Sequence, residues 1–202
     1  IYGEFYDNIF VRQRGGYTAN DSQKFVFNRA HRFRFSADHE RVREFNLNSN
    51  GSDSSYLRQP LAFETMRKAG CPASLSFLML SVLNGRVDRT GIFIEQVDEE
   101  FLERNGFDSA GALYKFVQRS SSAPVFNDIR SGIEKKTREY EDYDDVAEIV
   151  TGLNASSEQR RREFVFDRFN LPQMMCYLAA RCLLQDTDDI RKNFYFYCDS
   201  DG

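Results

Sequence analysis

Residues 186–198 have the sequence DTDDIRKNFYFYC, an acidic loop between a predicted helix and a predicted strand. The helix is expected over 171–185, because Asn170 is a good N-cap and apolar residues follow it at helical spacing. The aromatic run 194–198 predicts a strand. The loop is therefore expected to emerge from a buried, rigid helix and to lead directly into a strand.

This loop carries the side chains that metal-assisted phosphoryl transfer requires. One carboxylate can orient an attacking hydroxyl group, and one amide oxygen can ligate Mg²⁺. Asp189 and Asn193 have the spacing D-x-x-x-N, one residue tighter than the D-x-x-x-x-N of protein-kinase catalytic loops. Asp188 is the alternative base, because an alignment across the loop can slip by one residue. The competing interpretation is an ordinary acidic turn, where Asp and Asn are common.

The composition of the 202 residues is that of a globular protein, with 41% hydrophobic and 29% charged side chains. The net charge of -4 gives no overall attraction to nucleic acid or to an anionic membrane. No apolar run reaches the roughly 18 residues of a membrane span. Because Ile1 is not a start methionine and opens no signal peptide, we expect a mature form or an excised fragment.

The four cysteines predict free thiols rather than a metal site. They form no C-x-x-C pair, and only His31 and His39 could join them in a zinc site. Cys176 and Cys182 are six positions apart, which puts them on different faces of the last helix. Buried free thiols are expected, with a disulfide as the alternative in an exported protein.

Residues 1–97 are predicted to form a β-rich half with one main helix. The helix is expected over 56–69, capped by Asp53 or Ser54 and ended by Gly70. Short aromatic or β-branched segments predict strands at 9–14, 24–28, 32–35, 42–47, 76–83 and 91–97, with Asn84-Gly85 as the turn between the last two.

Glu64 lies on the apolar stripe of that predicted helix. It follows Leu57 by seven positions and Leu61 by three, and residues with these offsets share one helix face. A carboxylate on an apolar face needs a partner. The sequence therefore predicts a partner for Glu64.

Residues 98–202 are predicted to be mostly helical, which makes the fold class α+β. Met174 and Met175 are expected in the core of the last helix rather than as ligands. The other expected elements are a short helix over 99–104, a strand over 112–117, a lid-like linker over 120–124, and a helix from Asp144 whose apolar face contains Val146, Ile149 and Val150.

The parts occur in the order that protein-kinase-like folds use: a glycine turn, a strand lysine, a helix glutamate, a connecting strand, and a helix before an Asp/Asn loop. More specifically, the sequence resembles the spore-coat CotH kinase family, atypical kinases found mainly in secreted and surface proteins. The similar blocks are 11–16 (R-G-x-S/T), 23–25 (the lysine strand), 46–48 with 56–58 and 61–64 ("LNLN…YLR..LAYE"), 91–98 ("G.Y.L.EQVD"), 111–115 ("G.LYK") and the tail ("D…(H)NYYLY").

This resemblance covers nearly the whole chain and implies an atypical protein-kinase-like fold with two lobes. Residues 1–97 would be a β-rich N-lobe, and residues 98–202 a helical C-lobe that is incomplete at its C-terminus. The implied cofactors are ATP and Mg²⁺.

The resemblance also implies roles for residues of the first half. Lys24 would contact the ATP phosphates and pair with Glu64, with a purely structural salt bridge as the alternative. The segment from Glu95 to Val97 would connect the lobes, with backbone groups facing adenine; a surface position is the alternative for Glu95. Arg58 would support phosphate or the carboxylate network, and its alternative is an ordinary charge on the helix face.

In the second half, the resemblance implies a catalytic loop. Asp189, with Asp188 as its rival, would orient the acceptor hydroxyl group. Asn193 would bind Mg²⁺, with Asp189 as a further candidate ligand. Lys115 is an additional cofactor-binding candidate, and the alternative for it is a solvated strand end.

Three departures from the family pattern limit the expected activity. Ser22-Gln23-Lys24 stands where the family has P-K-K, and Lys192 stands where the family has a histidine before Asn193. The family's P-W-D-x-D segment, which supplies the principal Mg²⁺ aspartate, would follow residue 202. We therefore expect a catalytically incomplete fragment, because the metal carries much of the transition-state charge stabilisation.

The expected function is transfer of the γ-phosphoryl group of ATP to Ser or Thr of an exported or surface protein, in an extracellular or surface location. No nucleic-acid partner and no membrane span are expected. The alternative is a non-catalytic surface or adhesion module on the same fold. A structural coat domain whose acidic loop binds Ca²⁺ ranks last, because no sixfold oxygen-ligand spacing is visible.

Overall fold

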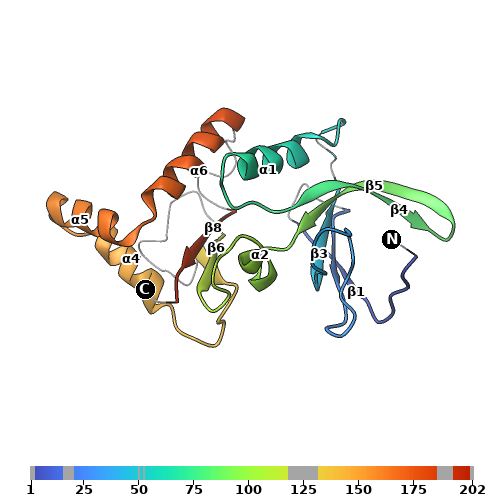
Figure 1. Cartoon of the computed structure of the whole chain (residues 1–202), viewed down its shortest axis with the longest axis horizontal. Helices are drawn as coiled ribbons and strands as arrows, with labels where there is room; N and C mark the ends of the chain where they lie inside the picture. Colours follow the sequence, from blue (N-terminus) through green and yellow to red (C-terminus); the bar gives the residue numbers. More distant parts are fainter. Residues whose placement is uncertain are drawn as a thin grey trace. The chain divides into compact units, whose positions relative to one another are not determined.

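The computed structural model describes residues 3–15, 21–49, 51, 53–117, 132–185 and 193–200 (Figure 1). The chain divides into two compact units. Unit 1 comprises Ile1–Lys68 and Pro72–Val97, and unit 2 comprises Ala69–Cys71 and Asp98–Gly202. Each unit contains an antiparallel sheet of its own.

Unit 1 is built on a five-stranded antiparallel sheet with the order β1-β2-β3-β5-β4, and helix α1 joins β3 to β4. The elements are β1 Phe10–Gln13, β2 Gln23–Val26, β3 Glu44–Asn48, α1 Arg58–Lys68, β4 Ser76–Leu83 and β5 Arg86–Glu95. The predicted strands are confirmed apart from their ends, with one exception. The segment 32–35 forms only an isolated bridge, from Phe33 to Val42.

Strand alternation gives this sheet an aromatic face and a polar face. Phe25 lies opposite Phe45 in the register, with ring centroids 4.8 Å apart, and Phe93 packs 5.0 Å from Phe45. Side chains from outside the sheet cover this face: Phe27, Phe33, Phe35, Val42, Tyr6 and Ile9. Truncating one buried ring to alanine costs about 3–5 kcal/mol. The aromatic face therefore fixes the register, and with it the residues on the polar face.

Helix α1 is shorter than predicted at both ends. Asp53, one of the two predicted caps, lies before the N-cap position of a helix that begins at Arg58, but its Oδ2 atom accepts a hydrogen bond of 3.0 Å from the backbone N–H of Arg58, the first helical residue. Gly70 follows the helix with φ of +83°, a conformation that glycine adopts without strain. No residue of α1 is fully buried, and Leu61 is exposed. The predicted apolar stripe through Leu57 and Leu61 is therefore not buried.

The turn Asn84-Gly85 joins β4 to β5 as predicted. Both residues have positive φ, 52° and 77°, which a type I′ hairpin turn requires. Strand β5 begins at Arg86, earlier than predicted, and pairs with β4 along its length. Of β5, only the segment from Ile92 to Glu95 pairs with β3. The first half of β5 therefore continues with β4 as a two-stranded ribbon beyond the sheet (Figure 1).

Unit 2 combines a three-stranded antiparallel sheet, ordered β7-β6-β8, with helices. Its elements are α2 Glu99–Arg104, β6 Ala112–Phe116, β7 Ile133–Lys135, α4 Asp144–Leu153, α5 Glu158–Arg168, α6 Leu171–Leu184 and β8 Phe194–Cys198. Antiparallel sheets and helices confirm the α+β class. Within the described residues, none of the helices is long and apolar enough to cross a bilayer. The predicted linker 120–124 lies outside the described residues.

The core of unit 2 encloses a buried lysine. The Lys135 ammonium group donates to the Asp142 carbonyl at 2.7 Å and lies 5.3 Å from the ring centre of Tyr114 and 6.0 Å from that of Tyr143. The Tyr114 hydroxyl donates a short hydrogen bond to Asp145. Burial, together with that carboxylate, raises the pKa of Tyr114. The buried polar groups of this core are thus hydrogen-bonded, as burial requires.

Helix α6 is less buried than its apolar sequence predicts. Asn170 caps it as expected, accepting a 3.2 Å hydrogen bond from the backbone of Gln173. Met174 and Met175 are exposed, the latter by 62%, and only Ala180 of this helix is fully buried. The prediction that the methionines belong to the core is therefore wrong. Helical spacing places apolar side chains on a face, but it does not determine what covers that face.

Glu4 ties the N-terminal segment of unit 1 to the segment that covers the aromatic core. Its carboxylate accepts from both terminal nitrogens of Arg41, at 2.7 and 2.8 Å, and from the Tyr6 hydroxyl at 2.7 Å. Hydrogen bonds from Arg41, and then from Tyr6, lower the pKa of Glu4 to about 2. The ionised form is therefore favoured in the folded chain.

This lowered pKa predicts an acid-dependent contribution to stability. The contribution is complete above the ordinary pKa of 4.5 and is lost as pH falls through about 2. Urea unfolding of wild type and Glu4→Gln should differ most at pH 6–7 and converge as the pH approaches about 2. Arg41→Gln should reproduce the effect, because it removes the main cause. A difference that stays constant from pH 7 to pH 2.5 would contradict this assignment.

The four cysteines are free thiols in very different surroundings. Cys71 is buried, Cys198 is half-buried, and Cys176 and Cys182 are exposed on α6. Burial, with a smaller effect from the Asp145 charge, raises the pKa of Cys198 to about 12. The prediction of free thiols is confirmed, while the prediction of burial fails for the two on α6.

The four thiols should therefore react with an alkylating reagent at different rates. A rise in pKa from 9.0 to about 12 lowers the thiolate fraction of Cys198 at pH 8 by a factor of about 10³. Iodoacetamide should modify Cys176 and Cys182 first, and Cys198 only on unfolding in urea. Peptide mass spectrometry over a time course measures the order. Labelling of native Cys198 at the rate of Cys176 would refute the assignment.

Candidate functional site

Lys24 lies on β2, on the polar face of the unit 1 sheet, and forms an ion pair with Glu44 of β3. Both side chains are mostly buried, with 16% and 20% exposed. In the register Lys24 lies opposite Asn46, so Glu44 is on the same face, two residues along. The predicted pair between Lys24 and Glu64 is not formed, because the adjacent strand already supplies a carboxylate.

Glu64 has a partner on its own helix instead. Its Oε1 atom lies 2.6 Å from the ammonium nitrogen of Lys68, one turn along α1. This hydrogen bond from Lys68 lowers the pKa of Glu64. The side chain is 46% exposed, so it is not a carboxylate on a buried apolar face. Glu64 therefore needs no cation from another element of the fold.

The polar face also carries Asn46 and Asn48, which belong to the sequence block 46–48 but had no predicted role. Asn46, with only 4% exposed, donates from Nδ2 to the Gln96 side-chain oxygen at 3.1 Å. Two residues along, Asn48 accepts from Arg14 at 2.9 Å. The alternation in Glu44-Phe45-Asn46-Leu47-Asn48 is the sequence signal for this arrangement, because residues two apart on a strand share a face.

The connector from Glu95 to Val97 ends unit 1. Glu95 is buried, with 3% exposed, so the surface alternative is wrong. Its backbone N–H donates to the Leu75 carbonyl at 3.0 Å, and its Oε2 atom accepts from the Leu75 N–H at 2.9 Å. Gln96 donates from its side chain to the Val97 carbonyl at 3.3 Å. These bonds hold the end of β5 and the two residues that follow it.

Arg58 is a surface residue at the start of α1. Its side chain is 84% exposed, and its Nε atom lies 3.9 Å from a carboxylate oxygen of Asp53. An exposed pair at this distance is weak. The geometry agrees with the alternative of an ordinary charge on the helix surface.

Two predicted residues of unit 2 lie in or beside its sheet. Lys115 of β6 has its ammonium nitrogen 5.9 Å from the ring centre of Tyr195, its neighbour on β8. Asn193 is exposed, has φ of +63°, and donates its backbone N–H to the Phe116 carbonyl at 2.7 Å. Asn tolerates this left-handed conformation better than most residues do. Asn193 thus stands where β8 begins.

Asp188 and Asp189, the predicted catalytic residues, lie outside the described residues. In the part of the chain that is described, no group of three His, Cys, Asp or Glu side chains could hold a metal ion. The roles of Asp189, Asp188 and Asn193 at a metal therefore stay predictions.

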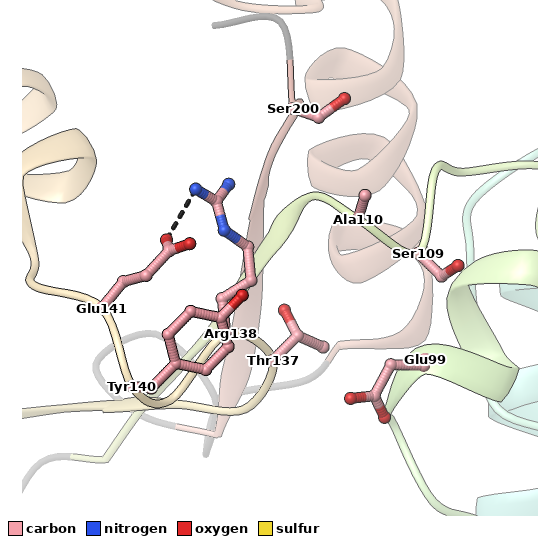
Figure 2. A pocket seen from close by; sticks show the side chains of 8 residues that line it. All are labelled: Glu99, Ser109, Ala110, Thr137, Arg138, Tyr140, Glu141 and Ser200. Atoms are coloured by element: carbon pink, nitrogen blue, oxygen red, sulfur yellow. Dashed lines mark ion pairs between the residues drawn. The ribbon is translucent and has the colours of Figure 1, made fainter.

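Unit 2 also contains an open pocket of about 480 Å³ at one end of its sheet (Figure 2). It is lined by Glu99, Ser109, Ala110, Thr137, Arg138, Tyr140, Glu141 and Ser200. Arg138 is paired with Glu141 at 2.6 Å, which raises the pKa of Arg138. The Ser200 hydroxyl donates to Asp108 at 2.6 Å. Among the described residues, none of the predicted catalytic, cofactor-binding or metal-binding residues lines this pocket.

Comparison with known proteins assigns the chain to a family. The family model described as CotH kinase protein matches residues 11–202, which include nearly all of both units. No curated protein matches the chain. A match of this extent includes the lysine strand, the segment ending in Glu95-Gln96-Val97-Asp98 and the acidic loop. The chain therefore belongs to the CotH kinase protein family.

Proposed function

We propose that this chain is an atypical kinase domain that transfers the γ-phosphoryl group of ATP to Ser or Thr of an exported or surface protein. The family match over residues 11–202 carries the proposal. The order of elements supports it, with a lysine strand, a helix between β3 and β4, and a helix that leads into an Asp/Asn loop. Unit 1 then corresponds to the N-lobe and unit 2 to the C-lobe.

The polar face of unit 1 has the side chains that a nucleotide requires. Lys24 supplies a cation for phosphate oxygens, and Asn46 supplies a buried acceptor, Oδ1, that has no hydrogen-bond partner among the residues that the structure describes. When bound, ATP with its Mg²⁺ supplies the phosphoryl group and part of the charge neutralisation. Val97 would present its backbone to the base, beside the same face.

Glu44 changes the expected arrangement of the lysine. In protein kinases a strand lysine pairs with a glutamate from a helix, and the position of that helix controls the pair. Here the lysine and its carboxylate come from adjacent strands of one sheet. We propose that Glu44 holds Lys24 in place whatever the position of α1, and that Lys24 exchanges this carboxylate for phosphate when nucleotide binds.

The acidic loop would perform the chemistry. Asp189, or its neighbour Asp188, would accept a hydrogen bond from the attacking hydroxyl and orient it. Asn193 would ligate Mg²⁺ through its side-chain oxygen, since hard cations prefer oxygen ligands. Lys115 would add positive charge from β6.

A second candidate function is a non-catalytic binding module on the same fold. The ion pairs of unit 1 favour it, because Lys24 is paired with Glu44 and Glu64 is paired with Lys68. The strand-to-helix pair of active kinases is therefore not assembled. In this alternative the polar face has a structural role, and no phosphoryl transfer occurs.

Nucleotide binding and phosphoryl transfer test these functions. Millimolar Mg-ATP should raise the melting temperature of wild type. Lys24→Ala should abolish the shift, because it removes the phosphate cation. Lys68→Ala is the matched control: it removes an exposed lysine of the same unit and should keep the shift. In the full-length protein, Asp189→Ala should lower phosphate incorporation by about 10²–10⁴, the usual loss of an acid–base group.

Two outcomes would count against the proposal. Unchanged incorporation in both Lys24→Ala and Asp189→Ala would overturn the assigned roles. A wild-type chain that shows no thermal shift with Mg-ATP, and a full-length protein that incorporates no phosphate, would favour the non-catalytic binding module.

A further inference from the structure

Strand β4 carries a stripe of exposed apolar side chains. Leu78, Leu80 and Val82 are two residues apart and therefore share one face of the strand, and Val87 of β5 lies opposite Val82 in the register. All four side chains are between 45% and 67% exposed. No charged residue interrupts β4 from Ser76 to Leu83. Soluble proteins rarely leave so continuous an apolar patch open to water, and such patches mark contact surfaces.

Strand β4 is also the edge of the unit 1 sheet. The strand order ends with β5-β4, and among the described residues only β5 pairs with it. Natural edge strands are protected from further pairing by lysine, by proline or by a bulge. Strand β4 contains neither lysine nor proline. Its one irregularity lies between Ser81 and Val82, where the partner strand supplies the extra residue, Asp88. The backbone of β4 can therefore extend the ladder of hydrogen bonds.

Helix α1 is anchored near the start of β4, not along the whole strand. Arg67, in its last turn, donates to the carbonyl of Ser74, two residues before β4 begins. At the other end of α1, Gln59 accepts a hydrogen bond from Asn48 of β3. Exposure increases along β4, and Leu83 at its end is 63% exposed. The outer half of β4 is thus open to a partner.

The stripe matches itself when the strand is reversed. In an antiparallel pair of two β4 strands centred on Leu80, each Leu80 lies opposite its equivalent, and Leu78 lies opposite Val82 of the second copy. These pairs fall on one face, so apolar side chains meet apolar side chains. The charges of Asp88 and Arg89 on β5 neutralise each other at 2.7 Å and would not repel a second copy. A charged partner would lose hydration against the stripe without gaining an ion pair from it.

We propose that β4 pairs antiparallel with β4 of a second copy of this chain, centred on Leu80, and so joins two five-stranded sheets into one continuous sheet. The contact is closed at the dimer, because a two-fold axis passes between the two Leu80 residues. One short strand pair is a small contact compared with the roughly 800 Å² per partner of a standard stable interface. We therefore expect a reversible dimer with a dissociation constant of about 1–100 μM. This inference does not depend on the proposed function.

Sedimentation equilibrium of the whole chain tests the dimer. The dimer fraction of wild type should rise between about 5 and 300 μM. Leu80→Lys should stay monomeric throughout, because pairing would place two like charges directly opposite each other. Leu61→Lys is the matched control: it changes a leucine of α1 that is 54% exposed and should dimerise as wild type does. Both variants should keep the wild-type melting temperature at the lowest concentration, since both positions are exposed.

Cysteine cross-linking tests the register, in a chain whose exposed Cys176 and Cys182 are replaced by serine. With oxidised glutathione, Leu80→Cys should form a disulfide-linked dimer, because directly opposed residues lie at the Cα separation of a disulfide. Leu78→Cys alone should not, because its two copies would be four residues apart along the paired strands, about 13 Å. A mixture of Leu78→Cys and Val82→Cys should cross-link, since these positions are opposed.

Three results would overturn the inference. The first is a wild-type chain that stays monomeric at the highest concentration; if that monomer binds phosphatidylcholine vesicles and Leu80→Lys does not, the stripe contacts a lipid surface instead. The second is a Leu80→Lys chain that dimerises like wild type, which would place the dimer contact elsewhere. The third is cross-linking of Leu78→Cys alone at the rate of Leu80→Cys, which would contradict the antiparallel register.

Discussion

The alternation of β3 is the constraint on which the rest of unit 1 depends. Phe45 and Leu47 face the aromatic core, so Glu44, Asn46 and Asn48 must lie on the opposite face. A slip of one residue would place the three polar residues in the aromatic core and remove Phe45 and Leu47 from it, which the packing forbids. Burial of Phe45 and Leu47 by the hydrophobic effect thus determines on which face the polar residues lie.

This constraint gives the proposed nucleotide site its rigidity. The Lys24–Glu44 pair joins adjacent strands, and Asn46 is held through Gln96 to the residue that ends unit 1. A site on paired strands is positioned more accurately than one on loops. The carboxylate that secures the lysine lies in the same sheet, so the lysine is held by strand register rather than by the docking of a helix. We therefore propose that, in this member of the CotH kinase protein family, a carboxylate on the adjacent strand holds the lysine.

Local signals in the sequence identified the elements better than their partners. The Asn84-Gly85 turn and the Asn170 cap each follow from the chemistry of one or two residues, and the structure has them. The partner of Lys24 depends on the register of β2 against β3, which no local pattern gives. Met175 was misplaced because helical period does not show what covers a face. The roles of Asp188 and Asp189 remain predictions.

The polar face of the unit 1 sheet is the proposed nucleotide-binding surface. Titration of the isotope-labelled chain with Mg-ATP, followed by NMR, tests it most directly. Nucleotide bound to this face should shift the signals of the Asn46 side-chain amide and of Lys24, with little change at Thr137 and Tyr140 of the unit 2 pocket. Shifts that map to the pocket, with Asn46 and Lys24 unmoved at saturation, would contradict it.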